Sequence, residues 1–147
     1  MPVLVDYNLT FLDKSWEWLN DPDIRKLTLT PDFTREEQQA FYNSLPGRMD
    51  YWIKGLTEND LPIGAMGLKH ITYQDAEFWG YIGDKRYWGK GIGSFMMLQA
   101  INKAKELGLD QLYLFVDELN QRAKQLYTRN GFHCIQPGSK EKYLINL

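Results

Sequence analysis

Hydrophobic and polar positions along the chain follow a helical pattern first and a strand pattern from about residue 50 onward. Asp21-Pro22 is typical of an N-cap followed by proline at the first helical position, and it predicts a helix to about Leu27. The segment Thr34-Arg-Glu-Glu37 has the spacing of a capping box and predicts a second helix to about Ser44. We therefore expect the first forty-odd residues to be helical, in short pieces.

The middle of the chain has the pattern of β-strands. Residues 50–56 and 61–71 are strand-like, and the turn-forming segment Glu58-Asn59-Asp60 lies between them, which predicts a hairpin. Residues 77–82, with the sequence EFWGYI, form a third expected strand that is rich in aromatic residues and interrupted by Gly80.

The rest of the chain alternates between the two patterns. The longest helical pattern runs over residues 91–107 and ends at Gly108, and a helix over residues 120–130 ends at Gly131. The nearly continuous apolar run LYLFV, residues 112–116, is typical of a strand buried on both faces. Two short strands are expected around the turn Pro137-Gly138. This order predicts a mixed α/β (α+β) fold, with residues 1–147 as a single domain.

Composition and charge exclude several classes of protein. A chain of 147 residues with 44% hydrophobic and 24% charged residues has a globular composition. Its net charge of −2 gives no sign of a nucleic-acid or membrane-surface partner. It has neither a signal-peptide pattern nor an apolar run of membrane-spanning length, and its one cysteine, Cys134, suits a reducing compartment. We expect a cytoplasmic protein that is a monomer or homodimer.

The most informative segment is YWGKGIGS, Tyr87–Ser94, which follows an expected strand and opens the longest expected helix. Its glycines, Gly89, Gly91 and Gly93, allow a tight turn and the close approach of a ligand to the backbone. Free N–H groups and the helix dipole at such a position favour an anion, for example a pyrophosphate. A glycine-rich turn without a ligand is the alternative.

Two other nucleotide-binding loops do not fit this segment. The Walker pattern G-x-x-x-x-G-K-[ST] is absent. A Rossmann loop follows the first strand of its fold, whereas three expected strands precede this loop.

A second group of residues lies in NQRAKQLYTRNGF, residues 120–132. Asn120 and Tyr127 are seven positions apart, about two helical turns, so both project from one helix face. Each has an ordinary structural explanation, Asn120 as an N-cap and Tyr127 as a half-buried aromatic residue. Their occurrence after the glycine loop, a long helix and an apolar strand favours a functional site.

Through these two segments the sequence resembles the GNAT superfamily of acetyltransferases, over roughly residues 60–133. In that family the loop follows the pattern Q/R-x-x-G-x-G/A and binds the pyrophosphate of CoA. The register that starts the helix at Gly91 places Trp88 at the first position, and the alternative register places Arg86 there. We prefer the first, because the Tyr-Trp-Gly loop and WLNDPDIRKL at residues 18–27 are similar to the branch that modifies ribosomal proteins, antibiotics and amino sugars.

The resemblance implies a mixed, mostly antiparallel central sheet flanked by helices, with acetyl-CoA bound between two splayed central strands. Tyr81, Ile82 and Gly83 would pair with the pantetheine arm, and a backbone N–H there would form an oxyanion hole worth on the order of 3 kcal/mol. Tyr127 would protonate the departing CoA thiolate, and Asn120 would hold the cofactor through its side-chain amide. The loop residues assigned to the pyrophosphate are Gly89, Lys90, Gly91, Ile92, Gly93 and Ser94.

The acceptor amine must lose a proton before it attacks, because an alkylammonium has a pKa of about 10. Some members of the family carry a Glu for this on the strand before Asn120, but the matching residue here is Phe115. Glu77, at the start of the strand that leads to the loop, is our candidate base, and a solvated strand-end carboxylate is the alternative. Asp117 and Glu118 are weaker candidates. No cluster of His, Cys and Asp predicts a metal site, so acetyl-CoA, as co-substrate, is the only cofactor we expect.

The predicted function is the transfer of an acetyl group from acetyl-CoA to a primary amine of a small molecule, with a nucleotide-linked amino sugar as the leading acceptor. A protein N-terminus, an aminoglycoside or polyamine, and a non-catalytic acyl-CoA-binding sensor are the alternatives. Of six aromatic residues that would suit a sugar-stacking wall, we expect most in the core and a minority facing the acceptor. They are Trp16, Trp18, Tyr51, Trp52, Trp79 and Tyr81.

Overall fold

A computed structural model describes residues 1–147, which form one seven-stranded sheet with helices on both faces. The strands are β1 (Pro2–Asp6), β2 (Trp52–Glu58), β3 (Leu61–Lys69), β4 (Asp75–Ile82), β5 (Gln111–Asp117), β6 (His133–Gln136) and β7 (Lys140–Asn146). Their order in the sheet is β1-β2-β3-β4-β5-β7-β6. Only β4 and β5 pair in parallel, so the sheet is mixed and mostly antiparallel, as predicted.

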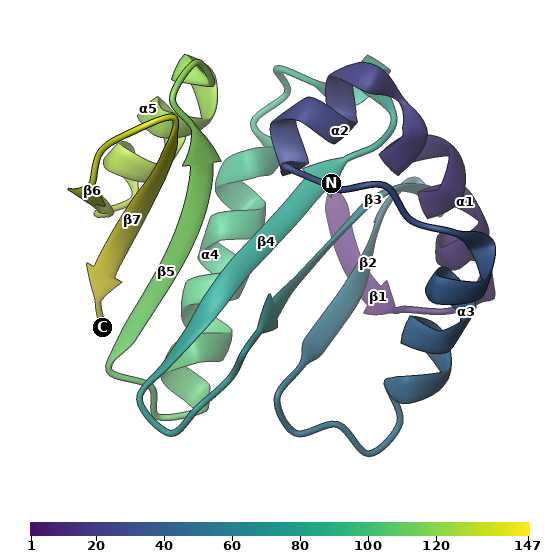
Figure 1. The fold of residues 1–147 in the computed structure, drawn as a ribbon, viewed down its shortest axis with the longest axis horizontal. Helices are drawn as coiled ribbons and strands as arrows, with labels where there is room; N and C mark the ends of the chain where they lie inside the picture. The colour runs from purple at the N-terminus through teal and green to yellow at the C-terminus, as the bar shows by residue number, and fades with distance from the viewer.

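The helices are α1 (Leu9–Asn20), α2 (Pro22–Thr28), α3 (Arg35–Ser44), α4 (Ile92–Glu106) and α5 (Gln121–Arg129), with a 3-10 turn η1 (Lys85–Tyr87). Figure 1 shows that β4 and β5 diverge from each other, with α4 visible between them. Side chains of α4 and α5 pack on one face of the sheet, and those of α1 and α2 pack on the other.

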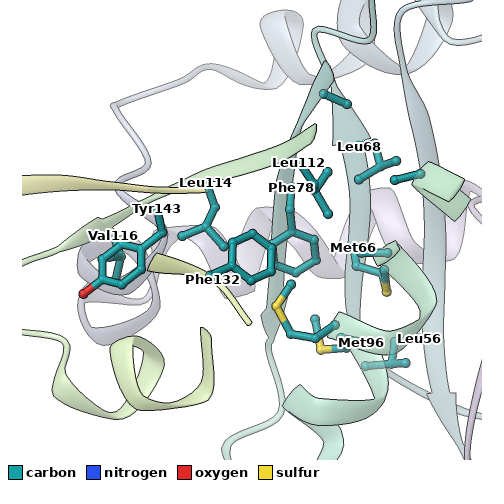
Figure 2. Close-up of a cluster of buried hydrophobic side chains, with 14 of the residues drawn as sticks. Leu56, Met66, Leu68, Phe78, Met96, Leu112, Leu114, Val116, Phe132 and Tyr143 are labelled. Carbon is teal, nitrogen blue, oxygen red and sulfur yellow. The ribbon is translucent and has the colours of Figure 1, made fainter. Parts of the chain in front are cut away.

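The main core lies between the sheet and α4. Met97 and Ala100 of α4 are fully buried in one cluster with Met66 of β3 and Leu112 of β5, and Figure 2 shows Phe78 and Met96 in the same cluster. Burial of the methionine, leucine and phenylalanine side chains contributes about 1.5–3 kcal/mol each, so this cluster fixes α4 against the sheet.

Several local predictions are confirmed. The Asp21 side chain accepts from the N–H groups at the start of α2, and Thr34 and Glu37 form the complete capping box of α3. In the β2–β3 turn, Asn59 and Asp60 have φ values of 51° and 64°, the conformation that a tight two-residue hairpin requires. These features depend on residues close in sequence, which is why the pattern predicts them.

The expectation of a purely helical N-terminal region is wrong at its start. Pro2–Asp6 form β1, which pairs with β2 at the edge of the sheet, for example Leu4 opposite Leu56. Five residues are too few for the alternation of hydrophobic and polar positions that marks a strand to be recognised. The strand exists because its partner lies some fifty positions later in the chain.

The expectation that residues 112–116 are buried on both faces is also wrong. Leu112, Leu114 and Val116 are buried against α4, whereas Tyr113 and Phe115 on the opposite face are only partly buried. The ammonium groups of two lysines of β7 lie over these two rings, Lys140 over Phe115 and Lys142 over Tyr113.

No helix of the chain combines the length and the apolar character that crossing a membrane requires.

Candidate active site

The central feature of the site is the gap between β4 and β5. Three residue pairs join the two strands, the last being Glu77 opposite Tyr113. Beyond this pair β4 continues to Ile82 and β5 to Asp117 without pairing, and the strands diverge (Figure 1). Backbone groups that face the gap therefore have no strand partner.

The gap is faced by the backbone of Gly80 and Ile82. The N–H of Gly83 donates to the carbonyl oxygen of Ile63 at 2.7 Å and so faces β3. Because hydrogen-bonding direction alternates along a strand, the backbone of Tyr81 also faces β3, whereas that of Gly80 and Ile82 faces the gap. The Ile82 carbonyl accepts from Trp88 Nε1 at 2.8 Å, which agrees with this direction. Of the three residues expected to pair with the pantetheine arm, Ile82 directs its backbone toward the gap, whereas the backbone of Tyr81 and Gly83 faces β3.

The glycine loop leads into α4 with two residues in the left-handed region. Gly89 has a φ of 75° and Gly91, the N-cap of α4, has a φ of 80°, conformations that glycine adopts without a steric cost. The helix starts at Ile92 with Gly91 as its N-cap, within one residue of the start that the preferred register places at Gly91. No side chain caps this helix, so its first N–H groups remain free for an anion.

The glycines of the loop have different surroundings. A Cβ atom at Gly91 would meet nothing within 4 Å, whereas one at Gly93 would lie 2.9 Å from Leu126 Cδ2. Gly93 therefore allows α4 and α5 to pack closely. Ser94 is exposed, and the Ile92 side chain is buried in the core, so only the backbone of Ile92 can face a ligand.

Positive side chains surround the loop. Lys90 is exposed on it, and a Cβ atom at Gly89 would lie 2.7 Å from Nη2 of Arg122, which places this guanidinium beside the loop. Arg86 is engaged with Asp84 through two hydrogen bonds of 3.0 and 2.7 Å. Arg122 was not among the predicted site residues, although it lies only two positions after Asn120.

Asn120 is the N-cap of α5. Its Oδ1 accepts from the N–H of Ala123 at 3.2 Å, so the ordinary explanation of this residue holds. Its Nδ2 group makes no hydrogen bond within the chain and remains available as a donor. Asn120 can therefore cap the helix and bind a ligand at the same time.

Tyr127 lies inside an aromatic cluster. Its ring centroid is 6.5 Å from that of Phe78, 6.1 Å from Phe132 and 6.3 Å from Tyr143. Its hydroxyl makes no hydrogen bond within the chain. Burial raises the pKa of Tyr127 to about 12, so the phenol stays protonated at neutral pH.

A cavity of about 400 Å³ passes through the strand gap. Tyr127 and Leu114 line it from the α4 face, Gly80 lines it within the gap, and Trp79 and Tyr81 line it from the α1–α2 face. Glu77 also lines it. The structure thus gathers Tyr127, Glu77 and the free edge of β4 around one space, although the sequence separates them by up to fifty positions.

Glu77 lies where the gap begins. Its side chain is 15% exposed, with Lys69 Nζ 3.7 Å and His70 Nε2 3.9 Å from its carboxylate oxygens. Both contacts are longer than a hydrogen bond. The carboxylate therefore lies beside Lys69 and the imidazole of His70 without a hydrogen bond to either, and its low exposure argues against a freely solvated strand-end group.

The cavity on the α1–α2 face has an aromatic wall with one polar end. Of the six aromatic candidates, Tyr51, Trp79 and Tyr81 line it. Gln38 lines it too and is 9% exposed, and its Nε2 donates to the Leu12 carbonyl at 2.8 Å. Since that carbonyl only accepts, the orientation of the amide is fixed, and Gln38 Oε1 is left without a donor from the chain.

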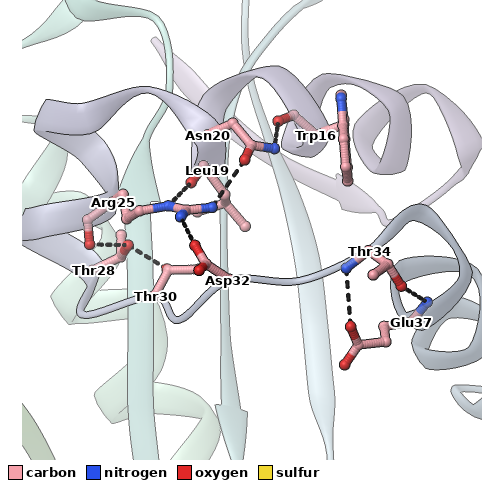
Figure 3. A network of polar contacts seen from close by, with 9 residues as sticks. All are labelled: Trp16, Leu19, Asn20, Arg25, Thr28, Thr30, Asp32, Thr34 and Glu37. Carbon is pink, nitrogen blue, oxygen red and sulfur yellow. Dashed lines mark hydrogen bonds and ion pairs between the residues drawn. The ribbon is translucent and has the colours of Figure 1, made fainter.

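The segment between α2 and α3 forms part of the same wall. Leu29, Pro31 and Phe33 line the cavity, and Leu29 has a φ of 57°, which is uncommon for a branched residue. Figure 3 shows how this segment is held: Arg25 bonds to the Leu19 carbonyl at 3.1 Å and pairs with Asp32. These contacts join the segment to α2, and through Arg25 to the end of α1.

Replacing Gly91 tests whether the loop holds phosphates. Gly91→Val should raise the KM for acetyl-CoA at least tenfold, because the side chain would occupy the open space in front of the free N–H groups. The left-handed backbone adds a stability cost of about 1–2 kcal/mol. Steady-state kinetics with thermal unfolding measures both effects.

Gly47→Val is the matched control. Gly47 has a φ of 85° and an equally open surrounding, and it lies outside the loop, so this variant should lose stability but keep its KM. A folded Gly91→Val variant with an unchanged KM would show that the phosphates bind elsewhere.

Comparisons with known proteins agree with this geometry. A family model described as "Acetyltransferase (GNAT) family" matches residues 12–132. An uncharacterized protein of Methanocaldococcus jannaschii is 25% identical over 114 residues, which cover 76% of this chain and 23% of that protein. The chain therefore spans about a quarter of the length of this relative.

Two solved structures share the fold. Spermidine N-acetyltransferase from Vibrio cholerae, in complex with CoA and spermine, has a TM-score of 0.87 at 20% identity, covering 99% of this chain and 95% of that one. Campylobacter jejuni N-acetyltransferase PseH, in complex with acetyl coenzyme A, has a TM-score of 0.76 at 20% identity, covering 99% of each chain. At this identity the likeness concerns the fold alone.

Proposed function

The chain belongs to the GNAT family of acetyltransferases, and from this premise we propose that it transfers the acetyl group of acetyl-CoA to a primary amine of a small molecule. The observation that carries the proposal is the cavity through the strand gap, which brings Glu77 and Tyr127 to one space. A thioester held in the gap would be open to an amine that enters from the α1–α2 face. Direct attack then requires no acyl-enzyme intermediate.

The donor is held by the backbone and by positive charge. The uncapped start of α4, with Lys90 and Arg122 beside it, would bind the pyrophosphate of CoA. The N–H groups of Gly80 and Ile82 would bind the pantetheine arm and polarise the thioester carbonyl. One such donor stabilises the transition state by about 3 kcal/mol.

The transfer proceeds by one substitution at the carbonyl carbon. The amine nitrogen forms a bond to this carbon, and the carbon–sulfur bond then breaks. Tyr127 gives its phenolic proton to the departing thiolate and regains one from solvent, and Glu77 takes the proton that the amine loses. The raised pKa of Tyr127 does not oppose this step greatly, because the apolar surroundings also raise the pKa of a thiol in the same place.

For the acceptor we propose a nucleotide-linked amino sugar. The cavity is lined by two carboxylates, Glu37 and Glu77, and by two lysines, Lys69 and Lys140, so it lacks the negative charge that a polyamine would favour. Its aromatic wall suits the apolar face of a sugar ring. The free Oε1 of Gln38 suits a sugar hydroxyl as donor.

Release of CoA in the presence of a panel of amines tests the proposal. The purified protein is mixed with acetyl-CoA and either an amino sugar, a nucleotide-linked amino sugar, a polyamine or a peptide, and free thiol is followed with a colour reagent. We expect the highest kcat/KM with the nucleotide-linked amino sugar. Acetyl-CoA binding without amine-dependent thiol release would favour the non-catalytic sensor instead.

A further inference from the structure

The outer face of β5 and β7 carries a group of aromatic and basic side chains beside the cavity. We call Tyr113, Phe115, Lys140 and Lys142 the aromatic–lysine ledge. Lys140 Nζ lies 4.6 Å from the centroid of the Phe115 ring, and Lys142 Nζ lies 4.6 Å from that of Tyr113 and 5.8 Å from that of Phe115. These are cation–π distances.

The two lysines of the ledge have no acidic partner in the structure. Glu141, between them in sequence, pairs with Lys124 at 3.2 Å. Asp117 stands opposite Lys140 in the strand register, but its Oδ1 accepts from the N–H of Leu119 at 2.8 Å. The ledge therefore holds two lysines that form no ion pair within the chain and are available to an anionic ligand.

The ledge is continuous with the acceptor side of the cavity. Phe115 and Lys140 line the cavity themselves, together with Glu77. Tyr113 stands opposite Glu77, and Lys140 stands opposite Asp117, four residues further along β5, which is about 13 Å at the usual rise of a strand. An acceptor whose amine reaches Glu77 thus has room for a sugar ring before its far end meets the lysines.

Acidic residues lie at both ends of the ledge, Glu77 opposite Tyr113 and Asp117 opposite Lys140. Burial raises the pKa of the Tyr113 phenol, and the nearby carboxylates of Glu77 and Asp75 raise it further. Glu77 is the carboxylate of this face that lines the cavity and that an ammonium would meet, whereas the two lysines lie toward the other end of the ledge. An acceptor of matching charge has an amine at one end and an anion at the other.

We propose that the aromatic–lysine ledge binds the nucleoside diphosphate part of the acceptor, with the lysines on the phosphates and the rings of Tyr113 and Phe115 beside the base. This proposal rests on the proposed function, whose acceptor it makes more specific. It assigns the ledge to the acceptor and leaves the start of α4 to CoA.

Direct binding of free nucleotides tests the ledge without any acetyl transfer. The protein is first saturated with CoA, so that the phosphate site at α4 is filled, and uridine diphosphate or adenosine diphosphate is then titrated by calorimetry. We expect at least one of them to bind once per chain, with an affinity that falls as salt is added. The Lys140→Gln/Lys142→Gln double variant should bind it at least tenfold more weakly.

Lys105→Gln is the control, since Lys105 is an exposed and unpaired lysine of α4, away from the ledge, and this variant should bind as the wild type does. Absence of nucleotide binding to the CoA-loaded wild type would overturn the proposal. So would equal affinity in the double variant, or a double variant that raises the KM for acetyl-CoA instead. Acetyl transfer to amines in the panel is measured separately, so the proposed function stands or fails independently of these results.

Discussion

Tyr127→Phe should lower kcat by about 10²-fold and leave the KM for acetyl-CoA nearly unchanged. The substitution removes only a hydroxyl that bonds to no other group of the chain, so the aromatic cluster around Phe78 and Phe132 should keep its packing. The variant can no longer donate a proton to the departing thiolate. Because this proton is needed only in the transition state, kcat falls and the KM for acetyl-CoA does not change. Steady-state kinetics, with a thermal melt to confirm folding, measures the effect.

Tyr143→Phe is the control for this prediction. Tyr143 belongs to the same aromatic cluster, but its hydroxyl donates to Glu141 at 3.2 Å and it does not line the cavity. This variant should keep its kcat. A loss under about threefold in Tyr127→Phe would indicate that solvent protonates the thiolate.

The raised pKa of Tyr127 also predicts a pH dependence. A group with a pKa of about 12 is protonated over the whole range in which the protein can be assayed, so it remains a proton donor. We therefore expect that ionisation of this phenol causes no decline in kcat between pH 7 and pH 10. A wild-type decline in this range that Tyr127→Phe abolishes would contradict the assignment.

Glu77→Gln should lower kcat/KM by about 10²-fold at neutral pH if Glu77 is the base. The amide keeps the size of the side chain but cannot take the proton of the ammonium. The rate of the variant should then follow the neutral fraction of the amine, so its deficit should shrink as the pH rises toward about 10. Profiles of kcat/KM against pH for the wild type and the variant measure this difference.

The profile distinguishes a base from a binding group. If Glu77 only binds the ammonium, the loss should appear in the KM of the acceptor, with the shape of the pH profile preserved. Asp75→Asn is the control, because Asp75 lies on the same face of β4 but outside the cavity. A Glu77→Gln variant that matches the wild type in rate and pH dependence would remove Glu77 from the site.

The helices and their ends could be predicted from the sequence because capping depends on neighbouring residues. Gly108 and Gly131, expected to end α4 and α5, have φ values of 74° and 98°. The strand β1 and the exposed face of β5 could not be predicted, since both depend on distant segments. β1 requires β2 as its partner, and the surroundings of Phe115 include Lys142, which stands opposite it on β7.

The candidate site was predicted in its parts but not in its geometry. The free start of α4 and the position of Tyr127 follow from the glycine loop and from helical spacing. The register between β3 and β4 decides which N–H groups of β4 face the gap. The sequence does not reveal this register, so Gly80 was not among the predicted site residues. Likewise, the aromatic–lysine ledge exists only because β7 returns beside β5, where no sequence period indicates it.

Transfer of a ¹³C-labelled acetyl group tests the central claim most directly. The protein is incubated with acetyl-CoA labelled at the carbonyl carbon and with the best amine of the panel, and the label is followed by NMR. We expect the thioester signal to be replaced by that of an amide on the acceptor, with one CoA thiol released for each amide formed. Label that appears only in free acetate or on the protein, or that stays in the thioester while acetyl-CoA is bound, would contradict direct transfer to an amine.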